Sequence, residues 1–121
     1  MPEADIANSI LLATKKKLGL APDYTAFDPD IISYINSVFA QLHQLGIGPD
    51  ECFQIEDDSS KWNEFYTDPR LSMVRSFMYG KVSLWFDPPT GSVLSARQDL
   101  VAEYEWRLTV AAETIRDENA E

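Results

Sequence analysis

Apolar side chains recur every three or four residues over most of the chain, which is the spacing of an amphipathic helix. The pattern predicts four helices, over about residues 5–18, 29–45, 69–86 and 93–115. The connections between them are short, as in a helical bundle. The sequence therefore predicts an all-α fold, a small bundle of about four helices with a long C-terminal helix and a short irregular or extended segment near residues 50–60.

Two of the predicted helices begin with the same pair of residues, Asp28-Pro29 and Asp68-Pro69. The Asp carboxylate can accept hydrogen bonds from amides of the first turn, and Pro suits the first helical position because no amide donor is needed there. Gly46 follows the second helix, where a left-handed C-terminal residue is common. These signals predict that Asp28 and Asp68 are the N-caps.

The last two predicted helices carry more apolar surface than a small bundle needs. The helix over 69–86 is apolar on most sides, through Leu71, Val74, Phe77, Met78, Val82, Leu84 and Trp85. Such a helix is buried at the centre of a bundle or in an oligomer interface. The helix over 93–115 spans about 35 Å at about 1.5 Å per residue, which is longer than a small core requires. Both features indicate that the monomer is not the functional unit.

One face of the last helix carries a seam of nearly heptad spacing, formed by Leu94, Val101, Tyr104, Leu108, Ala111 and Ile115. Trp106 lies off this seam, beside Glu105 and Arg107 on the polar side of the helix. An exposed Trp at such a position is typical of an interface anchor. We therefore expect Trp106 to mark a surface that binds another protein.

The segment 50–68 interrupts the helical pattern. It contains seven acidic residues and one basic residue, so its local charge is −6. Ser59 and Ser60 are expected to open a brief helical turn that carries the aromatic residues Trp62, Phe65 and Tyr66. We interpret the segment as a solvated connection pinned by aromatic anchors, in which the piece around Phe53 is able to pair as a strand.

The 121 residues fit a single domain over 1–121, with residues 116–121 expected to form a frayed, charged tail. The net charge of −10 disfavours a grip on DNA or an anionic membrane, because such binding depends on Lys and Arg. The chain could still surround DNA without holding it. A single cysteine, no apolar run of the ~20 residues that span a bilayer, and no signal-peptide pattern indicate a soluble, unexported protein.

Few side chains are suited to catalysis or metal binding. His43 is the only histidine and Cys52 the only thiol, and a surface His with a half-buried, packing Cys is favoured over a catalytic pair. One His and one Cys cannot supply a zinc tetrad. The acids of segment 56–58 lack the alternating spacing and central Gly of a calcium loop. We predict no catalytic residue, no metal and no cofactor, and therefore no enzyme.

Lys15, Lys16 and Lys17 form the only basic run in the chain. One interpretation is a contact with phosphate. The favoured one is a set of cations at the C-terminus of a helix, where the helix dipole stabilises positive charge.

Three stretches together resemble a known family. They are DYTAFDPDIISYINSVFAQLHQLGIGP over 23–49, LWFDPPT over 84–90 and EYEWRLTVA over 103–111. In this order and spacing they resemble the phage head–tail connector family, whose members are also called portal adaptor or head completion proteins. The resemblance covers about residues 5–115, and its motifs are structural punctuation without a catalytic signature.

The resemblance implies a virion protein of a tailed phage or prophage, assembled in the bacterial host cytoplasm. Its subunits would form a ring, typically twelve-fold, that joins the portal protein to head-closure or tail proteins and lets DNA pass without specific binding. In this family the C-terminal region often reaches the portal. The residues expected to contact the portal or a neighbouring subunit are Trp106, Leu108, Ala111, Ile115 and Trp85.

Two other functions are compatible with the sequence. The first is an acidic interaction module, such as an inhibitor that mimics DNA and occupies a host nucleic-acid-binding enzyme. The net charge favours it, but the acids are spread over loops and tail, and the apolar third helix favours the ring. The second is an enzyme that acts through His43 or Cys52. No other feature of the sequence supports an enzyme.

Overall fold

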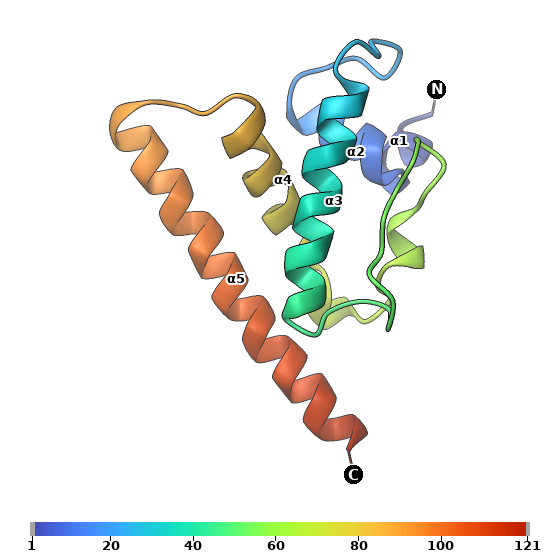
Figure 1. The fold of residues 1–121 in the computed structure, drawn as a ribbon, viewed down its shortest axis with the longest axis vertical. Helices are drawn as coiled ribbons and strands as arrows, with labels where there is room; N and C mark the ends of the chain where they lie inside the picture. Colours follow the sequence, from blue (N-terminus) through green and yellow to red (C-terminus); the bar gives the residue numbers. More distant parts are fainter. Residues whose placement is uncertain (1, 121) are drawn as a thin grey trace.

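The computed structural model describes residues 2–120 and is all-α (Figure 1). Its elements are the helices α1 (Glu3–Asn8), α2 (Ile10–Lys17), α3 (Asp28–Gln44), α4 (Met73–Phe86) and α5 (Gly91–Asn119) and two short 3₁₀ turns, η1 (Trp62–Glu64) and η2 (Pro69–Leu71). Residues 2–120 contain no strand, so the piece around Phe53 does not pair as one. The predicted all-α fold class is confirmed.

The first predicted helix is in fact two helices, and the prediction of one helix over 5–18 was wrong. Ser9 separates α1 from α2 with an extended backbone, at φ −76° and ψ 128°. Its hydroxyl accepts a hydrogen bond from the Leu12 amide at 3.2 Å and donates one to the Asp58 carbonyl at 2.8 Å. The Ile10 amide also donates to the Ser60 carbonyl. These long-range bonds break the helix at a point that local spacing does not mark.

The start of α3 is placed correctly by the Asp28-Pro29 signal, but Asp28 does not cap it. The helix begins at Asp28, and the N-cap residue is Phe27. The Asp28 carboxylate instead pairs with the Lys15 ammonium at 2.9 Å, and the same ammonium donates to the Pro22 carbonyl at 3.0 Å. Lys15 is 0 % exposed, so this ion pair joins α2 to α3 inside the protein.

The second Asp-Pro signal starts a different element from the one predicted. Asp68 accepts a hydrogen bond from the Arg70 amide at 2.9 Å and so caps the 3₁₀ turn η2, while α4 begins only at Met73. The last helix was predicted over 93–115 and is longer at both ends. Helix α5 begins at Gly91. It also continues to Asn119, so residues 116–119 are helical where a frayed tail was expected.

The core lies between α3, α4 and α5, with α4 in the middle of the three (Figure 1). Helix α4 buries Val74, Phe77, Met78 and Val82, and α3 buries Ile31, Ile35, Val38, Phe39 and Leu42. Gly80 lets α5 come close to α4, since a Cβ at this position would stand 2.7 Å from a methyl carbon of Val101. The nearly all-apolar helix is therefore the central helix of the bundle.

The segment between α3 and η1 is held against α3 by aromatic and amide contacts. The Phe53 ring of this segment and the Phe65 ring directly after η1 pack on Phe39, with centroid distances of 5.0 and 4.6 Å. The Asn36 side chain donates to the Ile55 carbonyl at 3.0 Å and accepts from the Ile55 amide at 2.8 Å. The aromatic anchoring of this connection is confirmed, and its acidic side chains remain outside.

Candidate interaction surface

Helix α5 is packed along only one narrow side. Of its 29 residues, Val101 and Leu108 are buried. Four large apolar side chains of the helix are exposed to solvent, namely Val93, Leu100, Trp106 and Val110. Trp106 is the most exposed of them, at 64 %, and Val110 lies one turn further along the same side of the helix. The subunit itself does not cover this face.

The five residues predicted to form an interface do not lie together. Trp106 is on the outer side of α5, whereas Leu108 is only 1 % exposed and packs in the core of the subunit. Ala111 and Ile115 are half-buried. Trp85 is 37 % exposed at the end of α4 and packs against the Tyr34 ring. Of this set, Trp106 and Trp85 offer surface to a partner, and the interface assignment itself stays a prediction.

An ionic cluster around Arg70 anchors the C-terminal end of α5. The Arg70 guanidinium contacts Asp68 and Glu118, each at 2.8 Å, and so links η2 to the last turn of the helix. The pKa values of both carboxyls lie below their usual range because of hydrogen bonds from Arg70. The pKa of Arg70 is raised by the same hydrogen bonds, so the cluster is fully charged at neutral pH.

Replacing Arg70 with Gln is expected to loosen the last turn of α5. Because the folded-state pKa values of Asp68 and Glu118 are lowered, their contribution is present at neutral pH and lost as the pH falls through those values. Amide protection factors at residues 116–119 should fall about twofold in Arg70→Gln at pH 7, and in the wild type once the pH has fallen through the lowered pKa values of the two carboxyls. Arg107→Gln, which removes an exposed pair with Glu103 in mid-helix, is the control. Unchanged protection in Arg70→Gln would contradict this role.

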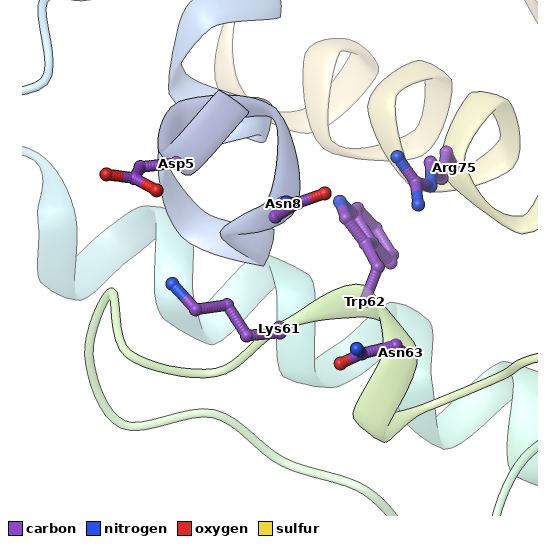
Figure 2. Close-up of a pocket in the computed structure, with 6 residues that line it drawn as sticks. All are labelled: Asp5, Asn8, Lys61, Trp62, Asn63 and Arg75. Atoms are coloured by element: carbon purple, nitrogen blue, oxygen red, sulfur yellow. The ribbon is translucent and has the colours of Figure 1, made fainter. Parts of the chain in front are cut away.

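A small polar pocket of about 280 Å³ lies where α1, η1 and α4 meet (Figure 2). Trp62 forms one wall and is buried, with its indole nitrogen free of any hydrogen bond within residues 2–120. The Arg75 guanidinium lies 5.4 Å from the Trp62 ring and donates to the Tyr66 hydroxyl at 2.7 Å. The other lining residues are Asp5, Asn8, Lys61 and Asn63. These contacts fix η1 against α4 and hold the Arg75 guanidinium in place.

The residues considered for catalysis lie apart from this pocket. His43 is exposed, and its Nε2 lies 3.0 Å from the Asp50 carbonyl oxygen. Cys52 is also exposed, so the expectation of a half-buried, packing thiol was wrong. In the described part of the chain, no group of three or more His, Cys, Asp or Glu side chains is placed to hold a metal ion. No helix of residues 2–120 has the length and apolar character needed to cross a membrane.

The lysine run is divided between two roles. Lys15 is buried in its pair with Asp28, whereas Lys16 and Lys17 are exposed in the last turn of α2, as cations at a helix C-terminus. The fold also brings Arg75 of α4 and Arg97 of α5 to the neighbouring hollows. The sequence analysis missed this gathering of cations, because the four residues come from three distant segments.

The fold and this surface define a small all-α protein whose longest helix leaves Trp106 and other large apolar side chains exposed to solvent. A family model described as Phage connector protein matches residues 10–114, and the chain belongs to this family of phage connector proteins. The resemblance seen in the three sequence stretches is thereby confirmed. The chain is accordingly a virion protein of the phage head–tail connection, which interacts with other phage head or tail proteins. Searches of curated proteins and of solved structures gave no match to the chain.

Proposed function

We propose that this protein is a non-enzymatic adaptor subunit that forms a ring, twelve-fold in the virion, between the portal and the head-closure or tail proteins of a tailed phage or prophage. The observation that carries the proposal is the exposed pair Trp106 and Val110 on the outer side of α5, which the subunit leaves uncovered. Trp is enriched among the residues that contribute most to protein interfaces, so an exposed Trp beside a second apolar side chain favours a surface for another protein. Membership in the connector family supplies the kind of partner.

The charge of the subunit suits a channel for DNA. The net charge is −10 per chain, and the negative charge of a ring is this value multiplied by the number of its subunits. Such a ring repels the phosphate backbone over roughly 8–10 Å at physiological salt, so DNA passes without adhering. Assembly in the reducing host cytoplasm agrees with a single cysteine that forms no intramolecular disulfide.

The proposal is tested by deletion of the gene and by co-purification. Phage that lack the protein should accumulate DNA-filled heads without tails, and the tagged wild-type protein should co-purify with the portal protein from infected cells. Co-purification with a host nucleic-acid-binding enzyme, together with normal tailed particles after deletion, would instead support the acidic DNA mimic.

A further inference from the structure

Four basic side chains gather on one groove of this acidic protein. Two adjoining hollows, of about 360 and 340 Å³, lie along α4 between α2 and α5 and meet at Lys17 and Tyr79, which line both. The basic residues that line the two hollows are Lys16, Lys17, Arg75 and Arg97. We call this feature the cationic groove.

No carboxylate lines the cationic groove, although the chain has twice as many acidic as basic residues. Within residues 2–120, none of the four cations forms an ion pair with an Asp or Glu. By contrast, Lys15, Arg70, Arg107 and Arg116 each have a carboxylate partner. The groove therefore carries positive charge that the subunit itself does not neutralise.

Three of the four cations of the groove contact neighbouring side chains. Arg75 is fixed by Trp62 and Tyr66, as described above. The Lys17 ammonium lies 5.7 Å from the centre of the Tyr79 ring, and Arg97 donates to the Ser83 hydroxyl at 3.5 Å. Positioned charges lose less conformational entropy when a ligand binds than mobile ones do. The groove is thus prepared for an acidic ligand.

The same chain carries a matching acidic segment on another side of the bundle. Residues 50–58 contain five acidic residues and no basic one, and the acids are exposed: Asp50, Glu51, Glu56, Asp57 and Asp58. Hydrogen bonds from Ser59 lower the pKa of Asp57, so this carboxylate stays ionised well into the acidic range. The segment is anchored on α3 and lies on the far side of α3 from α4 and α5 (Figure 1).

We propose that the cationic groove of one subunit binds the acidic segment 50–58 of the next copy in the ring. This inference rests on the proposed function and names the contact that closes the ring. Two different complementary surfaces on one chain produce head-to-tail association, and head-to-tail contacts form rings when the rotation closes. A second copy is favoured over nucleic acid as the occupant, because a net charge of −10 opposes the approach of a polyanion.

Charge reversal on each side tests the contact. The first variant carries Lys17→Glu and Arg97→Glu, the second carries Glu51→Lys and Glu56→Lys, and the third combines all four. Ring formation is followed by sedimentation of the protein alone and by native mass spectrometry of copies bound per portal. Juxtaposed like charges should weaken association at least about tenfold in the first two variants, and the combined variant should recover it.

A matched control separates local contact from net charge. Arg107→Glu with Arg116→Glu changes the formal charge from −10 to −14, as Lys17→Glu with Arg97→Glu does, since each reversal adds −2. Neither control residue lines the groove, so this variant should assemble like the wild type. Circular dichroism should show that every variant keeps the wild-type helix content.

Three outcomes would overturn the contact. The first is wild-type copy number in both double variants, and the second is no recovery in the combined variant. The third is binding of a short DNA duplex that is lost with Lys17→Glu and Arg97→Glu, which would assign the groove to nucleic acid. If the wild-type protein does not bind the portal at all, the proposed function fails with it. If it binds but the groove variants bind equally well, the groove contact alone fails.

Discussion

Replacing Asp28 with Ala is expected to lower the free energy of unfolding by about 3 kcal/mol. The Lys15 ammonium is completely buried and lies 2.9 Å from the Asp28 carboxylate. In the variant, the Pro22 carbonyl remains as a partner, but the positive charge loses its counter-ion inside the protein. Removing one partner of a buried ion pair costs far more than the pair is worth. The expected loss of stability is at the lower end of what is typical for a broken buried ion pair, because Asp28 is itself 21 % exposed.

Urea denaturation measures the free energy of unfolding of Asp28→Ala. Two further variants serve as comparisons. Asp30→Ala removes an exposed carboxylate from the same first turn of α3, so it should cost below about 1 kcal/mol through the helix dipole. Lys15→Met combined with Asp28→Ala should recover most of the lost stability, because no buried charge remains. If Asp28→Ala costs no more than Asp30→Ala, the pair does not contribute to the stability of the fold.

Trp106→Asp is expected to abolish the assembly of tailed, infectious particles while the subunit remains folded. The side chain is 64 % exposed, so the subunit loses little packing when it is removed. A central Trp in a protein interface commonly contributes about 2 kcal/mol or more, and a charge at this site would also be buried against the partner. Binding to the portal or to a neighbouring subunit should weaken at least about thirtyfold.

Complementation of a deletion phage measures the loss, and thermal unfolding measures the fold. Ser33→Asp, which adds the same charge at an exposed position of α3, away from this side of α5, should complement normally. Leu108→Asp would be a poor substitute for Trp106→Asp, because Leu108 is buried and its replacement would unfold the subunit. Infectious particles at wild-type yield from Trp106→Asp would remove α5's outer face from the interface.

The sequence predicted the helices best where apolar spacing and end signals agree. The Asp28-Pro29 pair placed the start of α3 within one residue, and Gly46 lies directly after its C-cap residue Leu45. The apolar spacing over 93–115 also predicted a helix there, and two of its seam residues, Val101 and Leu108, are buried in the subunit. These predictions succeed because helix capping and amphipathic spacing are local properties that neighbouring segments seldom override.

The errors come from side chains that have long-range partners. Ser9 interrupts a helical pattern because it bonds to the carbonyl of Asp58, 49 residues away. Asp28 is a residue type typical of an N-cap, but its carboxylate forms an ion pair with Lys15 and does not cap the helix. Residues 116–119 are tied down by Arg70 through Glu118, 48 residues away. None of these pairings leaves a periodic signal in the sequence.

The chain by itself therefore determined the all-α class, the presence of a nearly all-apolar helix and that of a long C-terminal helix, since these follow from which residue types recur at helical spacing. Only the tertiary structure decided that the nearly all-apolar helix is central, that Leu108 is buried while Trp106 is exposed, that Lys15 is buried, and that Lys17, Arg75 and Arg97 lie along the same groove. Charge and apolar spacing act along the chain, whereas the placement of side chains from different helices depends on how those helices pack.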